Sequence, residues 1–298
     1  MTARALAGGL EQRGVRRRRF SAFTRSRWLR DVRVLVAGGL LVLLVICGLF
    51  GSSLAPHGAE STNFDAILKS PSFAHPLGTD HVGRDVLSRG IVGARIALEV
   101  SLISLAVAGI IGVTAGLISG YAGGWTDRVI MGFADIVLSF PPLVLILAAT
   151  AALGVSLTHA MIAIGIAASP IFARITRGSV LSVRSLEYVT AARTLGGMPV
   201  RIVLRHVLPN IIAPLVVLAS LQVGLSILAE AGLSYLGLGA QPPTASWGYS
   251  VFQERSKLAT APWTVFGPGA FILLTVLAAN LFGDAIRDLT DPRQRNSH

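Results

Sequence analysis

Six apolar stretches of membrane-spanning length constrain this chain more than any other feature. They cover about residues 33–54, 90–119, 129–153, 156–175, 208–230 and 263–284. A helix of about 20 apolar residues crosses the hydrocarbon core of a bilayer. A helix also satisfies its backbone polar groups internally, which a membrane segment must do. The sequence therefore predicts an all-α integral membrane protein with six transmembrane helices.

The composition supports a membrane protein and argues against a nucleic-acid partner. The mean hydropathy is +0.66, with 52% hydrophobic and 14% charged residues. The net charge of +11 is high, but a nucleic-acid binder spreads its Lys and Arg over a solvated face and lacks such apolar runs. The one cysteine, Cys47, lies in the first apolar stretch, so neither an intrachain disulfide nor a cysteine-based metal site is expected.

Prolines interrupt several of the expected helices. Pro141 and Pro142 lie in the third stretch and Pro214 in the fifth, and each marks an expected kink. The fourth stretch is the weakest span, because Pro170 and Arg174 lie near its end. The first stretch could instead be a cleaved signal peptide. Its apolar run and the tail before it are long for one, which favours an uncleaved helix.

The distribution of basic residues predicts the orientation. Of the 26 Lys and Arg residues, 20 fall on one side of the six-helix arrangement and six on the other. The richer side is expected in the cytoplasm. Both termini then lie inside, as the tails 1–32 and 286–298. The loop 176–207 is also cytoplasmic, whereas the loops 55–89 and 231–262 lie outside. The expected location is the bacterial inner membrane.

The cytoplasmic loop contains the basic segment TAARTLGGMPVRIVLRHVLPN, residues 190–210. It predicts a short helix, a break at Gly196, Gly197 and Pro199, and a second helix. The small residues Ala191 and Ala192 allow another surface to approach the backbone closely. The flanking arginines could pair with acidic groups of a partner or with lipid headgroups. An amphipathic interfacial loop is the plainer alternative.

The spacing of this segment resembles the EAA loop of ABC-importer permeases. Thr190 stands where that family has an acid, and His206 where it has isoleucine; the alanine pair, the glycine and the Leu-Pro fit. The resemblance implies coupling helices that dock into a groove on ATP-binding subunits. The residues that it assigns to coupling are Thr190, Ala191, Ala192, Leu195, Gly196, Gly197, Arg201, His206, Leu208 and Pro209.

Three further motifs narrow the resemblance. They are HPLGTDHVGRDVLSRGIVGARIAL (75–98), LSYLGLGAQPPTASWG (233–248) and FGDAIRDLTDPR (282–293). The first two are similar to signatures of the dipeptide, oligopeptide and nickel permease branch, and the third resembles the C-terminal signature of its second subunit, the DppC/OppC type. The resemblance implies the type I ABC-importer permease fold over residues 33–285 and import of dipeptides or oligopeptides. Nickel or another small ligand is the alternative cargo.

The chain itself is not expected to be an enzyme. A phosphate-binding loop ends in Gly-Lys-Ser/Thr, and the only lysines, Lys69 and Lys257, lie outside such a pattern. The resemblance places ATP and Mg on two partner ATP-binding subunits, beside a homologous second permease and an extracytoplasmic substrate-binding protein. No cofactor, metal or catalytic residue is expected in this chain. An ion-coupled secondary transporter and an intramembrane enzyme are alternatives from other classes, but neither explains the 190–209 loop.

Three acids in the apolar stretches are candidates for the transport pathway or its gate. Glu99 follows Arg95 by four residues, so an ion pair within one helix is expected. Asp135 is expected to hydrogen-bond a neighbouring helix near the cytoplasmic gate. Glu230 lies at the outer end of the fifth stretch.

The outward loops supply candidates for contact with the binding protein: Asp80, Arg84, Asp85 and Trp247. His75 and His81 lie among the same acids and suggest a metal site. Their spacing fits no standard ligand pair, so a folded loop is the preferred interpretation. The basic tail RGVRRRRFSAFTRSRWLRDVR is expected to lie along lipid headgroups or simply to set the topology.

Overall fold

The computed structural model describes residues 32–290, with side chains for 32–288. The basic tail 1–31 and residues 291–298 lie outside the described residues, so the predictions made for the tail stay predictions. Within the described chain every regular element is helical. The long helices are α2 (Val32–Leu54), α3 (Val86–Ala122), α4 (Gly124–Leu138), α5 (Pro142–Leu153), α6 (Leu157–Arg184), α9 (Leu208–Tyr235) and α11 (Trp263–Thr290).

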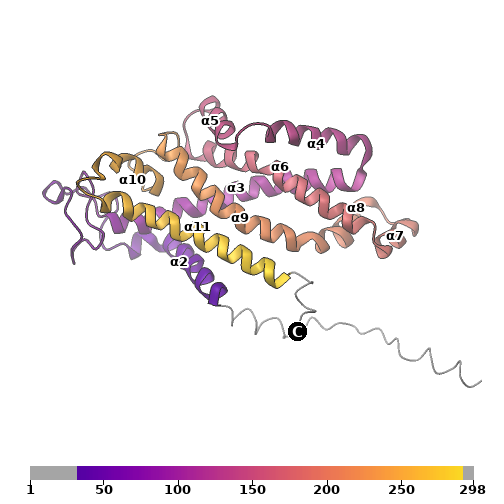
Figure 1. Cartoon of the computed structure of the whole chain (residues 1–298), viewed down its shortest axis with the longest axis horizontal. Coiled ribbons are helices and arrows are strands. Elements are labelled where there is room, and N and C mark those ends of the chain that lie inside the picture. Colours follow the sequence, from indigo (N-terminus) through magenta and orange to yellow (C-terminus); the bar gives the residue numbers. More distant parts are fainter. Residues whose placement is uncertain (1–31, 291–298) are drawn as a thin grey trace, which may run out of the picture.

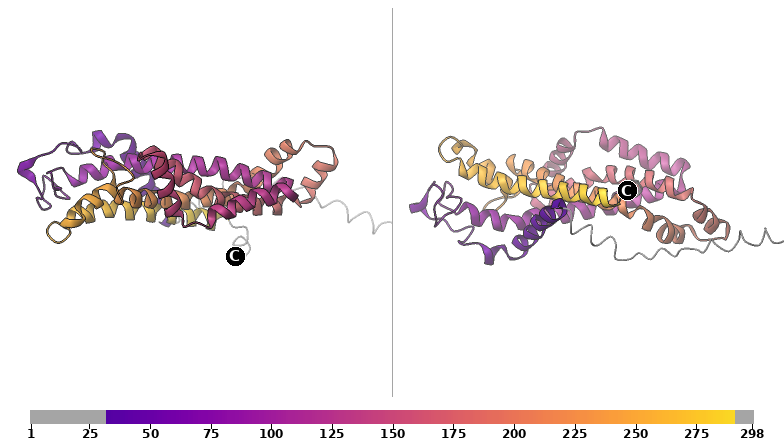
Figure 2. Two further views of the ribbon diagram at one scale, coloured as in Figure 1. Left: turned by 90° about the horizontal axis from the view of Figure 1, so that it is seen from above. Right: turned by 60° about the horizontal axis from the view of Figure 1, so that its bottom comes forward.

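The molecule is an elongated bundle with a different irregular structure at each end (Figure 1). One end carries α7 (Glu187–Thr194), α8 (Pro199–Ile202) and the π-helical turn η2 (Val203–Val207). We call residues 187–207 the hairpin; it projects beyond the other helices (Figure 2). The opposite end, the loop end, consists of residues 55–85 and 236–262 and includes α10 (Trp247–Glu254).

Glycine allows α3 and α6 to pack closely along much of their length. On α3, Gly112, Gly116 and Gly120 recur every four residues and face α6; a Cβ at Gly112 would lie 2.3 Å from the Ser169 carbonyl oxygen. On α6, a Cβ at Gly165 would lie 2.7 Å from the Ser104 carbonyl oxygen of α3. Such small residues at four-residue spacing let membrane helices approach until their backbones touch. This contact forms the centre of the bundle.

The third apolar stretch, predicted as one helix over 129–153, is two helices. Those helices, α4 and α5, meet at about 90° across a three-residue break, Ser139–Pro141. The reason is local: Pro141 and Pro142 have no amide hydrogen, so the carbonyls of Val137 and Leu138 lose their regular helical donors. Five continuous helices are long and apolar enough to span a bilayer, and the bent pair supplies a sixth candidate.

The segment 176–207, predicted as a cytoplasmic loop, is mostly helical. Helix α6 continues to Arg184, nine residues beyond the predicted end at 175. From Pro199 to Tyr235 the chain forms one span of 37 residues, because α8, η2 and α9 follow each other without a gap. The inner end of α6 turns one apolar side toward these elements, where Val180 packs with Val207 and Ile211. That burial explains why the helices extend beyond the apolar stretches.

Candidate functional site

The turn between α7 and α8 is a helix C-cap that requires glycine. Gly196 has φ +77°, a left-handed conformation that side chains with a Cβ rarely adopt. The amide of Gly196 donates to the Arg193 carbonyl, and the amide of Gly197 to the Ala192 carbonyl, each at 3.0 Å. These two bonds define a Schellman motif, which ends α7 and reverses the chain. Pro199 then begins α8, in the first helical turn where a missing amide hydrogen costs nothing.

One face of the hairpin is anchored by a small apolar core. Val189, Ile202 and Val207 are buried together with Val180 of α6 and Ile211 of α9. Ala192 packs partly against the same cluster, and a Cβ at Gly197 would lie 2.7 Å from the Ala192 carbonyl oxygen. The hairpin is therefore packed onto the inner ends of two long helices and is not a free tether.

The other face of the hairpin exposes apolar side chains. Leu195 is 87% exposed, and Met198, Val200 and Leu204 are also mostly exposed. We call these four residues the apolar tip. Leu195 and Met198 lie on the projecting turn, before the candidate span that begins at Pro199, so their uncovered apolar side chains form a surface that suits a partner. Of the residues predicted for coupling, Thr190, Ala191 and Arg201 also lie exposed, whereas His206 and Leu208 are half-buried.

The two departures from the expected motif occupy different surroundings. The Thr190 hydroxyl donates to the Leu186 carbonyl at 3.3 Å, within its own helix, so its side chain is turned along the surface of α7. The His206 ring lies 6.4 Å from the Tyr188 ring, between centroids, and so bridges the second half of the hairpin to α7. Neither position carries an acid.

A π-helical turn joins the hairpin to α9. Pro209 lacks an amide hydrogen, and its ring would clash with the carbonyl four residues back in a regular helix. The backbone widens here because of this: the Leu208 amide donates to the Val203 carbonyl, five residues back. The side-chain amide of Asn210 donates to the His206 carbonyl at 2.7 Å. The widened turn keeps the helix continuous past the proline.

Partly buried polar contacts hold the base of the hairpin, at the end of α6, to α3 and α4. The Arg184 guanidinium donates to the Gly120 carbonyl at the end of α3, at 2.8 Å. Arg177 makes a two-pronged ion pair with Asp127 of α4, at 2.5 and 2.6 Å, and the Ser119 hydroxyl donates to the same carboxylate. The end of α6 that carries the hairpin is thus joined to α3 and α4.

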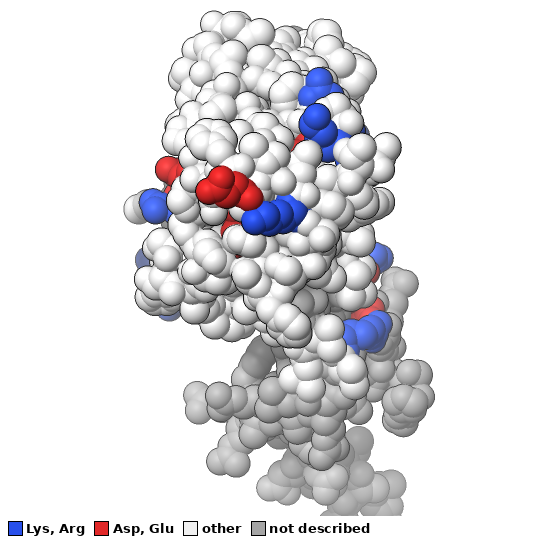
Figure 3. Space-filling model, turned by 90° about the vertical axis from the view of Figure 1, so that its left-hand side faces the viewer, with Lys and Arg blue, Asp and Glu red and all other residues white. Residues whose placement is uncertain are grey.

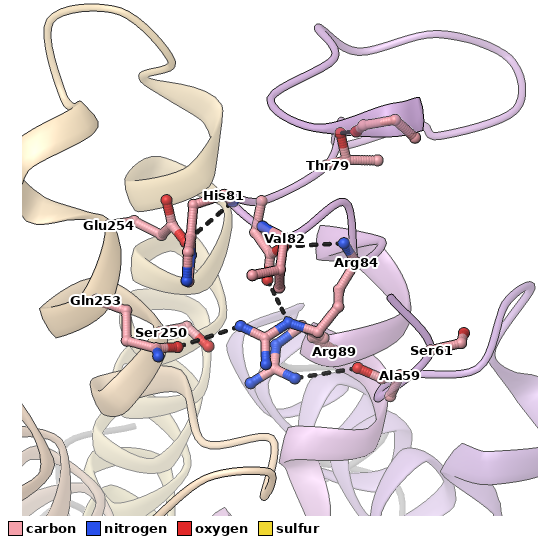
Figure 4. Close-up of polar contacts among 12 residues, drawn as sticks. Ala59, Ser61, Thr79, His81, Val82, Arg84, Arg89, Ser250, Gln253 and Glu254 are labelled. Carbon is pink, nitrogen blue, oxygen red and sulfur yellow. Dashed lines mark hydrogen bonds and ion pairs between the residues drawn. The ribbon is translucent and has the colours of Figure 1, made fainter. Parts of the chain in front are cut away.

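The loop end is organised by ion pairs. Arg84 donates to the Asp80 carboxylate at 2.6 Å and to Gln253 of α10 at 3.2 Å, and His81 pairs with Glu254 (Figure 4). Arg89 donates to the Ala59 carbonyl at 3.0 Å. The contacts with Gln253 and Glu254 tie the loop 55–85 to α10, and the Arg89 bond holds that loop to α3. The surface of this end shows acidic and basic side chains scattered among uncharged ones (Figure 3).

The residues predicted for binding-protein contact lie beneath that surface. Asp80, Arg84 and Asp85 are buried, and Trp247 is 5% exposed. Asp85 caps α3 by accepting from the Ser88 amide at 2.8 Å. The Trp247 indole donates to the Gly90 carbonyl at 2.8 Å. These side chains shape the loops from inside, so any docked protein would meet the residues around them.

Two side-chain groups at the loop end have donor atoms close enough to hold a metal ion. They are His57, His75 and Asp85, and Asp80, His81 and Glu254. Each group already contains a protein partner for its carboxylate: Asp85 accepts from Ser88, and Asp80 accepts from Arg84. These contacts make the side chains part of the loop structure, although the buried Oε2 of Glu254 has no hydrogen-bond partner within the described residues.

The three acids proposed for the pathway are not brought together. Glu99 pairs with Arg95 at 2.9 Å, the intrahelical ion pair expected from the spacing. Asp135 pairs with Arg174 of α6 at 2.6 Å, on an exposed face. Glu230 is buried and accepts from Ser234 and Ser246, at 2.6 and 3.0 Å, beside α10.

Sequence reasoning missed the partners that complete these contacts. Asp127 with Arg177 and Glu254 with His81 join residues 50 and 173 positions apart. The sequence contains a signal for the first pair. Asp127 lies just before the third apolar stretch and Arg177 just after the fourth, so both are expected at the same membrane boundary. For Glu254 no comparable signal exists.

Comparison with known proteins agrees with this architecture. Residues 112–296 match the family described as binding-protein-dependent transport system inner membrane component. The glutathione transport system permease protein GsiD of Pectobacterium atrosepticum is 41% identical over 276 residues, 91% of this chain and 92% of that protein. The probable D,D-dipeptide transport system permease protein DdpC of Escherichia coli K12 is 45% identical over 254 residues, 85% of each chain. The dipeptide transport system permease protein DppC of Alkalihalophilus pseudofirmus is 42% identical over 260 residues, 87% of this chain and 86% of that protein.

Solved structures support the fold. The MetNI methionine ABC transporter, in inward-facing conformations, has a chain that superposes with a TM-score of 0.56 at 20% identity, over 69% of this chain and 97% of that one. A second crystal form gives a TM-score of 0.59 at 19% identity, over 69% and 98%. The type I ABC-importer permease fold and the resemblance to the peptide branch are thus confirmed. The chain belongs to the family of inner membrane components of binding-protein-dependent transport systems.

Proposed function

We propose that this chain is one permease subunit of an ATP-driven importer that moves dipeptides or oligopeptides into the cytoplasm. The observation that carries the proposal is the hairpin: an apolar tip exposed on a segment whose other face is packed onto the inner ends of α6 and α9. In this proposal the tip seats on an ATP-binding subunit. ATP and Mg bind that partner, and closure of two such subunits moves the helices joined to the hairpin.

The same proposal covers the other subunits of the importer. A homologous second permease completes the pathway, and an extracytoplasmic binding protein delivers the ligand to the loop end. The termini lie in the cytoplasm, on the same side as the hairpin. The descriptions of the relatives, which name glutathione and dipeptides, favour a peptide over nickel. If the chain were an ion-coupled carrier, the apolar tip would have no role.

Reconstitution of the complete complex tests the proposal. The permease pair, the ATPase pair and the binding protein are placed in liposomes, and uptake of a radiolabelled dipeptide is followed with and without Mg-ATP. Uptake that requires both ATP and the binding protein is the expected result. Uptake driven by a proton or sodium gradient without ATP, or uptake of nickel in place of peptide, would overturn it.

A further inference from the structure

The exposed face of α4 carries a polar stripe, in a region that should lie within the bilayer. Arg128, Gly132, Asp135 and Ser139 recur at intervals of four, three and four residues, which places them on one side of a helix. Arg128, Asp135 and Ser139 are exposed, and so is Arg174 of α6, the partner of Asp135. The side chains of Asp135 and Arg174 are 63% and 58% exposed.

Contacts within the protein give the depth of this stripe. Residues 100–126, from α3 into the first residues of α4, contain no Asp, Glu, Lys, Arg or His, and the first 20 of them span about 30 Å as a helix. Ser119, near the inner limit, donates to Asp127 at the start of α4. Asp135 is eight residues further along α4 and Ser139, which follows the last residue of α4, is twelve, so they lie at most about 12 and 18 Å into the apolar layer.

Arg174 reaches Asp135 from a backbone position nearer to Ser119. A Cβ at Gly116 of α3 would lie 2.5 Å from the carbonyl oxygen of Ala173, the neighbour of Arg174. Gly116 is three residues, about 4.5 Å, to the outer side of Ser119. The Arg174 side chain then extends outward to reach Asp135 at 2.6 Å. The ion pair therefore lies well inside the apolar layer.

The break between α4 and α5 adds a second polar feature on the same face. Ser139, Pro141 and Pro142 are exposed, and Phe140 is about half exposed. The helical donor to the Leu138 carbonyl would be the amide of Pro142, which has no hydrogen. The Val137 carbonyl accepts instead from Phe140, at 3.3 Å. Irregular backbone at bilayer depth occurs only where protein covers it or where it borders a water-filled cavity.

Lipid cannot satisfy either feature. Ionisable side chains inside a membrane face the bundle interior or water, because their exposure to hydrocarbon costs several kcal/mol. A closely packed partner helix would favour small residues, whereas the stripe and the neighbouring Arg174 of α6 together present two arginines and an acid. On the next side of α4, Val129, Phe133 and Ile136 are exposed and apolar, which suits lipid or a partner.

We propose that the Arg128–Ser139 stripe of α4, together with Arg174, lines the water-filled solute pathway, and that Asp135 and Arg174 contact the charged ends of a zwitterionic peptide in transit. The carboxylate suits an ammonium group, and the guanidinium suits a carboxylate. This assignment rests on the proposed peptide import. The Asp135–Arg174 pair then has two roles: the two side chains contact the solute in transit, and each neutralises the charge of the other when no solute is present.

Cysteine accessibility tests the water-filled face. Cys47 is replaced by alanine, and Ser139→Cys and Ile110→Cys are made separately in the complete complex. Ile110 is 71% exposed on α3 at similar depth, so it serves as the matched control. A charged, membrane-impermeant methanethiosulfonate reacts only with a thiolate, which forms in water. We expect Ser139→Cys to react at least ten times faster than Ile110→Cys, with slower reaction when dipeptide and Mg-ATP are added.

Equal rates at the two cysteines, or no reaction at Ser139→Cys, would overturn the assignment. Water access does not depend on the cargo, so this result is separate from the uptake assay that tests the proposed function. Peptide uptake with an inert Ser139→Cys would leave the proposed function intact and remove the pathway assignment.

Charge exchange tests the contact with solute. Asp135→Asn and Arg174→Gln are each expected to lower dipeptide uptake at least ten-fold while the ATPase subunits still co-purify. The exchanged pair Asp135→Arg with Arg174→Asp restores an ion pair between α4 and α6. If the pair only joins two helices, the exchange restores uptake. We expect uptake to stay low while the ATPase subunits still co-purify; recovery of uptake would contradict the role in solute contact.

Discussion

The two ends of the bundle interrupt the apolar helices in opposite ways. The hairpin is held by buried apolar side chains and leaves an apolar tip exposed. The loop end is held by polar contacts around the buried Arg84–Asp80 ion pair; Trp247 is covered there, whereas Phe64 and Phe73 are exposed. A segment anchored by packing, with an uncovered apolar surface, is suited to being gripped by another protein. A segment locked by ion pairs instead keeps its own shape beneath a docked protein.

The largest effect is expected from Arg84→Met at the loop end. Both members of the Arg84–Asp80 pair are buried, and removing one leaves an unpaired buried charge, which costs about 3–5 kcal/mol. We expect a clear loss of thermal stability in detergent and faster proteolysis of residues 55–85. Lys69→Met removes an exposed cation from the same loop and serves as the control. Equal behaviour of the two variants would show that the loop end does not depend on its ion pairs.

An intermediate effect is expected from Gly196→Val in the hairpin. Valine at φ +77° stores about 1–3 kcal/mol of backbone strain and displaces the tip. ATP-dependent uptake should fall about ten-fold while the thermal unfolding of the bundle stays nearly unchanged. The control is Gly109→Val on α3, where a Cβ meets nothing within 4 Å. A large loss of thermal stability in Gly196→Val would mean that the hairpin supports the bundle as strongly as the loop end does.

The smallest effect is expected from Thr190→Glu, which introduces the acid that similar loops carry. Thr190 is exposed on α7, so the stability should change by less than about 0.5 kcal/mol. Titration of the permease pair with ATPase subunits should show an affinity change of less than ten-fold. A larger change in affinity would show that the acid is part of the docking contact and that its loss has weakened this complex.

The membrane helices could be predicted because their apolar stretches are long and continuous. The start of α2 and of α11 lies within one residue of the prediction. The α4–α5 break was expected only as a kink. Two successive prolines remove two donors, and the angle that results depends on how α5 packs against α6.

The turn of the hairpin could also be predicted, since the two glycines and Pro199 encode a helix end and a helix start. Its anchoring could not. Val189, Ile202 and Val207 are buried because side chains of α6 and α9 pack against them, and the local sequence does not contain that information. The same holds for His81 and Glu254, which the chain brings together across 173 positions.

The most direct test of the coupling role compares Leu195→Asp with Thr194→Asp. Leu195 belongs to the apolar tip, whereas Thr194 is a neighbouring exposed residue outside it. Both variants add the same charge to the hairpin, and the amount of ATPase subunit that co-purifies with the permease is measured. The tip is expected to need an apolar surface, so Leu195→Asp should retain less than a tenth of the ATPase while Thr194→Asp retains most of it. Equal retention in the two variants would contradict docking through the tip.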